Sequence, residues 1–498
     1  MTLVPEIRIR KLNDAEIRSD QRYVLYWMVA SRRLQWNYGL QHAVKLANQQ
    51  QLPILILEAL RCDYEWSSAR MHQVFIHGMQ DNEQSAVDRG LRYMAYLEPE
   101  PGAGKGLLEA LAEDAAAVVT DEYPCLFVPK MQKAAANQLE QRWACPLYSV
   151  DSNGIVPLQM PEKTFARAFD FRRFFQKNAL DCLADHPVAD PLDSLHDTTR
   201  VQIRSEITER WAPADLSTFG SQKLNQFPYR ESVDPVAEFR GGPSTAQKEL
   251  SAFLRNRLSR YDEGRRDLDN CSTSGFSPYL RFGHLSSHQI VHDVLQSESW
   301  EPGKLKQKVT GSANGFWGTS EDAESFLDEL ITWREVGYNM SARNDDYDQY
   351  DSLPEWARTS LKEHQSDKRP SVYTLEEFEE ARTHEELWNA AQRQLVEEGR
   401  IHNYMRMVWG KKILHWSKSP QEALEIMIHL NNKYAIDGRD PNSYSGIFWI
   451  LGRYDRAWGP ERPVFGKIRY MSEDSTRSKL KVKNYVQRFA RTAASDNG

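Results

Sequence analysis

Residues 23–60 decide the fold of the first part of the chain, and their sequence is YVLYWMVASRRLQWNYGLQHAVKLANQQQLPILILEAL. Residues 23–30 and 53–60 are short apolar runs of the length of buried strands, and residues 36–49 between them have apolar side chains at helical spacing. Two further apolar runs follow, at residues 116–120 and 146–150. Strands that alternate with helices are typical of a doubly wound parallel sheet, which binds ligands at the carboxyl ends of its strands.

The rest of the chain divides by composition. Residues 186–243 are rich in Pro, Asp, Ser and Gly and have weak periodicity, which is typical of a connector. Beyond them the spacing of apolar residues becomes helical, in residues 325–339, 375–382, 385–397, 400–416 and 420–434. We therefore expect an α/β domain with a doubly wound parallel sheet at residues 1–185, a connector, and a mostly α-helical domain at residues 244–498.

The composition is that of a soluble globular protein. Of the 498 residues, 40% are hydrophobic and 27% are charged, and no apolar run approaches the roughly 18 residues that a membrane span needs. The N-terminus has no apolar core of a secretory signal, so we expect a cytoplasmic location, or a nuclear one in a eukaryote. Five scattered cysteines without short paired spacing favour free thiols over disulfides or a metal site.

Charge is unevenly distributed along the chain. The net charge is −7, yet residues 401–498 carry 17 Lys and Arg against 9 Asp and Glu, a net of +8. Such a segment could contact the phosphates of a nucleic acid. A solvated basic helix near residues 477–491 explains the charge equally simply, so both interpretations stay open on charge alone.

Glycines and a lysine at residues 102–106, GAGKG, look briefly like a phosphate-binding loop. The spacing of the glycines before the lysine is wrong for that motif, and no Ser or Thr follows the lysine. We therefore interpret this segment as a plain loop.

Small hydroxyl residues gather in residues 273–280, TSGFSPYL, with Tyr261 twelve residues before them. Hydroxyl side chains and a glycine at a turn, followed by a proline at a helix start, form a compact set of donors for a diphosphate. An ordinary capped helix is the more frequent meaning of such a segment when it is taken alone.

The same region resembles a known family. Residues 277–286, SPYLRFGHLS, resemble the FAD-binding stretch of the photolyase and cryptochrome superfamily, and the residues before them match it too. Residues 402–416, HNYMRMVWGKKILHW, 437–442, DGRDPN, and 465–471, FGKIRYM, are closely similar to class II photolyases. The resemblance covers almost the whole helical domain, whereas the first third matches loosely. It implies an enzyme that holds a U-shaped FAD in its helical domain.

The resemblance also implies roles for individual residues. The cofactor diphosphate would be held by Tyr261, Thr273, Ser274, Gly275, Phe276 and Ser277. Arg406 and Asp437 would pair beside the flavin ring, where Arg406 offers a fixed positive charge to the reduced flavin and Asp437 neutralises it. Asn403 would contact the cofactor nearby, and Asn431 matches an asparagine at flavin N5.

Three tryptophans have a spacing that suits electron transfer. Trp409 and Trp416 are seven apart on one helix, so they lie on one face about 10.5 Å apart along the axis, and Trp388 lies on the preceding helix. Spacing alone indicates a core stripe. The resemblance implies that these tryptophans pass electrons from the surface to photoexcited oxidised FAD.

A second set of residues is a candidate for binding damaged bases of DNA. Glu329 and Trp333 are four apart in an amphipathic helical pattern, which alone predicts a solvated carboxylate and a core ring. The resemblance implies that Glu329 hydrogen-bonds a flipped-out cyclobutane dimer, while Trp333, Met407 and Trp449 pack against it. Photolyases for the (6-4) photoproduct have histidines where this chain has Asn403 and Met407, so we expect cyclobutane pyrimidine dimers as the substrate.

The sequence thus predicts a DNA repair lyase in which photoexcited reduced FAD gives an electron to the dimer. A cryptochrome-like blue-light photoreceptor is the alternative, although a sensor has no need of the four lesion residues. A helical DNA-binding or scaffold protein without a cofactor is a third interpretation. We expect dimer-containing DNA as the partner, no membrane association and a monomer. A second antenna chromophore of deazaflavin or folate type stays open.

Overall fold

The structure, a computed structural model, describes residues 3–490, which form two compact units made of interleaved segments. Within the described residues, unit 1 takes its chain from residues up to 162, 178–252 and 275–302, and unit 2 from residues 163–177, 253–274 and 303 onward. The boundaries predicted from composition run along the chain, whereas the units exchange short segments. Among the described residues, no helix combines the length and the apolar character needed to cross a membrane.

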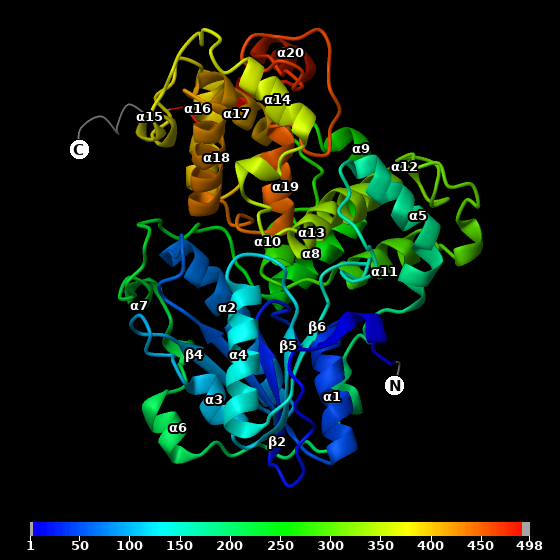
Figure 1. Ribbon diagram of the computed structural model, residues 1–498, viewed down its shortest axis with the longest axis vertical. Coiled ribbons are helices and arrows are strands. Elements are labelled where there is room, and N and C mark those ends of the chain that lie inside the picture. Colours follow the sequence, from blue (N-terminus) through cyan, green and yellow to red (C-terminus); the bar gives the residue numbers. More distant parts are fainter. Residues whose placement is uncertain (1–2, 491–498) are drawn as a thin grey trace. The chain divides into compact units, whose positions relative to one another are not determined.

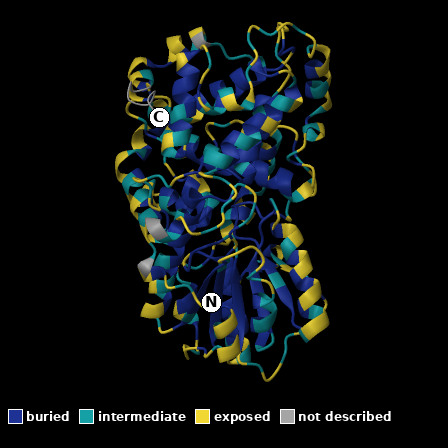
Figure 2. Ribbon diagram, turned by 90° about the vertical axis from the view of Figure 1, so that its left-hand side faces the viewer, coloured by how far each residue is buried: buried dark blue, intermediate teal, exposed yellow. Residues whose placement is uncertain are grey.

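Unit 1 contains a six-stranded sheet in the order β1-β6-β5-β2-β3-β4 (Figure 1). Five strands run parallel, and the short β1 pairs antiparallel with β6 at one edge. The strands are β1 (Ile9–Lys11), β2 (Tyr23–Met28), β3 (Ile54–Leu60), β4 (Arg92–Leu97), β5 (Ala115–Asp121) and β6 (Leu147–Val150). The residues of β2 and β5 are all buried, and Figure 2 shows strands of the sheet in dark blue. Burial on both faces explains why these strands are continuous apolar runs.

Helices between the strands complete this α/β unit. They are α1 (Tyr38–Gln50), α2 (Ala69–Asp88), α3 (Leu107–Ala112) and α4 (Val128–Trp143). α1 packs on β2 and β5, and α2 packs on β4. The predicted doubly wound, mostly parallel sheet is confirmed, and four predicted strands and the first helix lie within two residues of their observed bounds. The strands β1 and β4 were not predicted.

The backbone of the loop at residues 102–106 binds the carboxylate of Glu98. Glu98 Oε1 accepts hydrogen bonds from the backbone N–H groups of Gly102 and Gly104, each at 3.1 Å. The segment forms turns, as predicted for a plain loop. Its two amides are occupied by a carboxylate and are not offered to a phosphate.

Residues 186–242 contain only short helices among the described backbone. They are the 3₁₀ helices η2 (Pro191–Ser194) and η3 (Leu216–Thr218) and the helices α6 (Ser205–Arg210) and α7 (Ser221–Leu224). Three helices follow that lie wholly or mostly in unit 1, namely α8 (Pro243–Asn256), α10 (Ser277–Arg281) and α11 (Ser287–Ser297).

Unit 2 is helical. Its helices are α9 (Tyr261–Gly264), α12 (Glu321–Leu327), α13 (Arg334–Arg343), α14 (Glu355–Glu363), α15 (Leu375–Glu379), α16 (Glu386–Glu398), α17 (Asn403–Trp416), α18 (Pro420–Tyr434), α19 (Pro441–Ile450), α20 (Glu473–Lys479) and α21 (Lys483–Arg488). The first turns of α5 (Ala168–Ala184) also belong to it. The predicted α-helical C-terminal half is therefore confirmed, and α18 has the predicted bounds.

Two glycines let the central helices of unit 2 approach closely. A Cβ on Gly337 of α13 would lie 2.5 Å from the Pro441 carbonyl oxygen and 2.4 Å from Ser445 Oγ on α19. A Cβ on Gly410 of α17 would lie 2.8 Å from Ile450 Cγ1, also on α19. Helix α19 thus lies close to both α13 and α17, and at Gly337 the atom in the way is a backbone carbonyl oxygen that a side chain cannot displace.

Gly337→Ala should lower the free energy of unfolding by about 1–3 kcal/mol, because backbone atoms of α19 cannot yield as a flexible side chain can. Urea or thermal unfolding followed by circular dichroism measures this change. Gly446→Ala on the exposed side of α19 is the matched control, since a Cβ there meets nothing within 4 Å, and alanine has the higher helix propensity. Equal stabilities of the two variants would contradict the close packing.

Candidate active site

A turn of π-helix, η6 (Asp328–Trp333), joins α12 to α13 and carries two predicted lesion residues. The spacing predicts one continuous amphipathic α-helix here, and this is corrected: the segment is helical, but its middle turn is π-helical. Turns of this kind occur mostly as single interruptions of α-helices, frequently at functional sites. Glu329 and Trp333 both lie in this turn, and both are half-buried. Trp333 is therefore not the core residue that the spacing alone indicated.

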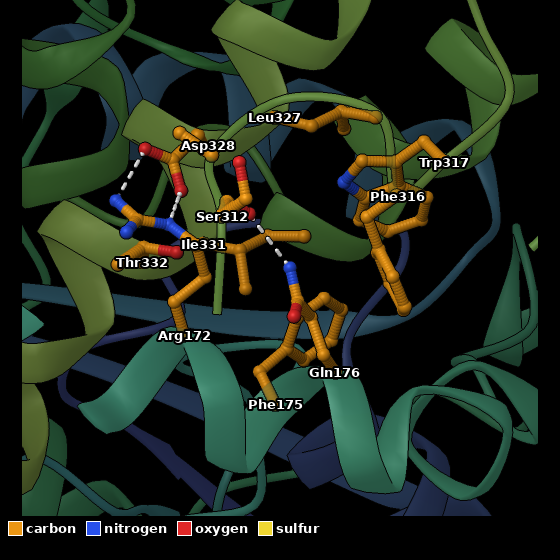
Figure 3. A pocket seen from close by; sticks show the side chains of 11 residues that line it. Arg172, Phe175, Gln176, Ser312, Phe316, Trp317, Leu327, Asp328, Ile331 and Thr332 are labelled. Atoms are coloured by element: carbon orange, nitrogen blue, oxygen red, sulfur yellow. Dashed lines mark hydrogen bonds and ion pairs between the residues drawn. The ribbon is translucent and has the colours of Figure 1, made fainter. Parts of the chain in front are cut away.

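An ion pair braces this turn from α5. Arg172 donates from Nε to Asp328 Oδ1 at 2.6 Å and from Nη2 to Asp328 Oδ2 at 2.8 Å, as Figure 3 shows. Gln176, one turn further along α5, donates to the Ser312 carbonyl oxygen and accepts from the Gly311 N–H, both at 2.8 Å. The cavity between these groups is about 10 Å³, roughly the minimum for one water. These contacts fix the position of η6, and the cavity between them is too small to be a ligand site.

Glu329 is paired with a cation that the sequence patterns did not reveal. Its Oε1 accepts from Arg265 Nη1 at 2.5 Å, and the Arg265 guanidinium also lies over the Tyr261 ring at 5.7 Å. Burial raises the pKa of Glu329, and Arg265 opposes part of that rise. In the sequence, the only indication that Arg265 belongs to this site is that it lies four residues after Tyr261, which puts both residues on one side of a helical turn.

The other predicted lesion residues are also reachable from outside. Met407 on α17 and Trp449 on α19 are half-buried. The Trp449 ring lies 5.0 Å from Lys411 Nζ and 5.4 Å from the Arg469 guanidinium carbon. The Arg469 guanidinium at this distance attracts the negative face of the aromatic ring and so restricts the movement of the ring.

Lys411 itself is fully buried beside that ring. Its Nζ donates to the Ile450 carbonyl oxygen, at the end of α19, at 2.7 Å. Burial lowers the pKa of Lys411 to about 7, while Asp455 raises it and Arg469 lowers it further.

Lys411 should make stability depend on pH in an identifiable window. Between pH about 7 and about 10, the unfolded lysine holds its proton and the folded one does not, so unfolding takes up a proton and stability rises with pH. The unfolding free energy of the wild type relative to Lys411→Met should therefore rise by about 1.4 kcal/mol per pH unit in this window. Urea titrations at several pH values measure the difference. A difference that stays flat would mean that buried Lys411 keeps its proton.

The residues predicted to hold the flavin ring lie on α17, α18 and the segment after α18. Arg406 Nη2 lies 2.9 and 3.2 Å from the two carboxylate oxygens of Asp437. Asn431 is buried, and its Nδ2 donates to Ser443 Oγ at 2.7 Å. No side chain or backbone N–H within residues 3–490 donates to Asn431 Oδ1, so that oxygen can accept a bond. Asn403 is exposed as the first residue of α17.

The residues predicted to hold the diphosphate fall in both units, in consecutive stretches of chain. In unit 2, Tyr261 is buried while Thr273 and Ser274 are half-buried; Gly275, Phe276 and Ser277 belong to unit 1. Gly275 has a φ of +73°, a conformation that favours glycine. Ser272, next to Thr273, has a buried hydroxyl with no hydrogen-bond partner among the described residues.

The three predicted electron-transfer tryptophans are connected, and all are buried. Trp388 Nε1 donates to the Trp409 carbonyl oxygen at 3.0 Å, and the Trp388 ring lies 6.1 Å from the Trp416 ring. Trp388 therefore lies between the other two. None of the three reaches the surface.

The basic C-terminal segment forms two short helices instead of one. α20 and α21 lie on either side of residues 480–482, and Arg491 lies outside the described residues. Before them, the Trp458 ring lies 4.6 Å from the Arg456 guanidinium and 4.1 Å from that of Arg469, which also pairs with Asp455 at 2.9 Å. Arg469 thus lies over the Trp458 ring as well as the Trp449 ring, so a second aromatic ring and further cations lie close to Trp449.

Known proteins with similar sequences are photolyases. The family model for DNA photolyase matches residues 24–192. The chain is 33% identical over 494 residues to a deoxyribodipyrimidine photo-lyase of Methanothermobacter thermautotrophicus, over 97% of this chain and 98% of that one. It is 29% identical over 488 residues to the protein of the same name from Potorous tridactylus, over 97% and 84% of the two chains.

A solved structure has the same fold. The crystal structure of a bacterial class III photolyase from Agrobacterium tumefaciens superposes with a TM-score of 0.65 and 18% identity, over 95% of this chain and 87% of that one. At this identity the likeness concerns the fold alone.

Proposed function

Because this chain belongs to the photolyase/cryptochrome superfamily and to its photolyase enzymes, we propose that it is a class II enzyme that splits cyclobutane pyrimidine dimers with light and FAD. The observation that carries the proposal is a contrast in burial. Glu329, Trp333, Met407 and Trp449 are half-buried and open to a ligand, whereas the three tryptophans assigned to electron transfer are buried.

The residues present fit a FAD. Arg406 supplies a fixed positive charge, and Asp437 keeps that charge compensated when the site is dry. The free Oδ1 of Asn431 can accept an N–H of the ring without giving it a proton. The buried hydroxyl of Ser272 has no partner in the described chain, and a diphosphate oxygen near Thr273 and Ser274 would supply one. When bound and reduced, FAD supplies under blue light one electron, which the dimer later returns.

The lesion residues prepare the dimer for that electron. Trp333, Met407 and Trp449 would offer apolar surface to a pyrimidine dimer that has left the stack, and the weakened stacking of a dimer lowers the cost of flipping it. Glu329, whose pKa is raised by burial, would donate or share a proton with a carbonyl of the dimer. That hydrogen bond stabilises the added negative charge while the ring opens.

DNA is the proposed partner, contacted through the basic C-terminal part of unit 2. The excess of Lys and Arg in residues 401–498 suits phosphate contacts. Asn403 and Met407 favour cyclobutane dimers as the substrate. Photolyases for the (6-4) photoproduct have histidines at these two positions. A monomeric state is part of the proposal, whereas the presence of an antenna pigment of deazaflavin or folate type stays open. Size-exclusion chromatography and the absorption spectrum of the purified protein test them.

The decisive experiment illuminates a thymine-dimer oligonucleotide with the purified, chemically reduced protein in blue light. We expect restoration of the undamaged bases in light and none in a dark control. A colourless protein would contradict FAD binding. Bound, photoreducible FAD without repair would instead favour a cryptochrome-like photoreceptor.

Glu329→Gln should lower the repair yield severalfold while leaving the FAD content unchanged, because an amide cannot give a proton to the dimer. Repair yield per absorbed photon and the flavin absorbance of the purified variant measure the two effects. Glu321→Gln, at an exposed position in the first turn of α12, is the matched control and should repair like the wild type. An unchanged yield in Glu329→Gln would exclude the proposed role of the carboxyl.

A further inference from the structure

The residue before Glu329 in the π-helical turn belongs to an ion pair of its own. Asp328 accepts two hydrogen bonds from the Arg172 guanidinium, at 2.6 and 2.8 Å, as Figure 3 shows. Both side chains are only 12% exposed, so salt and water screen this pair little. A planar guanidinium that gives two bonds to one carboxylate fixes its orientation as well as its position.

Arg172 is itself held in place on α5. Its Nη1 donates to the Gly311 carbonyl oxygen at 3.2 Å. Gln176, one turn later, accepts from the Gly311 N–H and donates to the Ser312 carbonyl oxygen, both at 2.8 Å. A Cβ on Gly311 would lie 2.8 Å from the Phe169 ring, so the loop packs tightly on α5. Helix α5 and this loop together form one support for Asp328.

The backbone of the turn carries this support to Glu329. The Arg334 N–H bonds to the Glu329 carbonyl oxygen, five residues before it, which is the hydrogen bond of a π-helix. A turn closed in this way holds one residue more than an α-helical turn, so it sets the directions of the side chains that follow Asp328. Because Glu329 comes directly after Asp328, a shift of Asp328 moves the Glu329 carboxyl with it.

Charged groups on three elements face the carboxyl of Glu329. Arg265, which follows α9, donates to it at 2.5 Å, and the other two charges are those of Asp328 in η6 and Arg172 on α5. Burial raises the pKa of Glu329, and Arg265 opposes part of that rise. Asp328 raises this pKa further, whereas Arg172 lowers it. The other titratable side chains in contact with Arg265 are Tyr261 and Asp262.

We infer that Arg172 and Asp328 are positioning residues of dimer repair, which act on the dimer only through Glu329. Their bidentate contact holds the carboxyl where it meets the dimer, and their opposite charges balance each other beside it. The inference rests on the proposed role of Glu329 in repair. It adds a source for the geometry and the proton affinity of that carboxyl, in a pair whose members lie 156 residues apart in the chain.

Removing either half of the pair should shift the pH profile of repair, in opposite directions. Asp328→Asn leaves the positive charge of Arg172 uncompensated, so the pKa of Glu329 falls and repair should end at a lower pH than in the wild type. Arg172→Gln leaves the negative charge of Asp328 uncompensated, so repair should extend to a higher pH. The repair yield per absorbed photon is measured at several pH values with full-length, chemically reduced protein and a thymine-dimer oligonucleotide.

Two further variants separate charge from geometry. Arg172→Lys keeps the positive charge but not the two parallel bonds, so it should keep the wild-type pH profile with a severalfold lower yield. Arg167→Gln, at the start of α5, breaks an exposed ion pair with Asp170 and is the matched control, which should repair like the wild type. Circular dichroism and flavin absorbance show that each variant is folded and loaded. A purely structural support would lower the yields without separating the profiles, and that result would overturn the inference.

A second measurement needs neither light nor DNA. In protein with isotope-labelled glutamate, the infrared band of a protonated carboxyl that is lost in Glu329→Gln reports the titration of this one group. Opposite shifts of this titration in Asp328→Asn and Arg172→Gln would support the inference even if the wild type repaired no dimers, a result that would reject the proposed function alone. Titrations that shift together, or not at all, would overturn the inference while leaving repair by the wild type intact.

Discussion

The ion pair between Arg172 and Asp328 holds the π-helical turn on which the candidate active site is built. Asp328 is the first residue of the turn, and Glu329 follows it directly. The chain beyond the turn is fixed at Gly337, where α13 lies so close to α19 that a Cβ would overlap backbone atoms. With both sides anchored, Glu329 and Trp333 have little freedom, and side chains held in this way can meet a ligand without prior rearrangement.

Much of the fold could be predicted, because its strands are buried on both faces. β2, β3, β5 and β6 are apolar runs that no surface element would contain. β1 escaped because it has only three residues, two of them charged, and its place in the sheet depends on pairing with β6, across the register Ile9↔Val150. β4 was missed although residues 93–97 form an apolar run as long as the predicted run at residues 116–120.

The candidate site was predictable in residue type but not in contacts. Arg406 and Asp437 pair as the resemblance implied, yet the pairs Arg265–Glu329 and Arg172–Asp328 join residues 64 and 156 apart in the chain. No local pattern reports contacts of such separation. A spacing of four residues suits a π-helical turn as well as an α-helical one, so the spacing of Glu329 and Trp333 could not distinguish them. Lys411 likewise gave no signal, because a lysine in a helix is usually solvated.

The Arg265–Glu329 pair bears on the proposed binding of a dimer. In the free protein the carboxyl of Glu329 already accepts a hydrogen bond from Arg265 Nη1 at 2.5 Å. Under the proposed function, a dimer carbonyl has to engage this carboxyl while Arg265 holds it in place, and a base without an acceptor at that point gains nothing from it. Selection of damaged bases would then depend on this hydrogen bond as well as on shape.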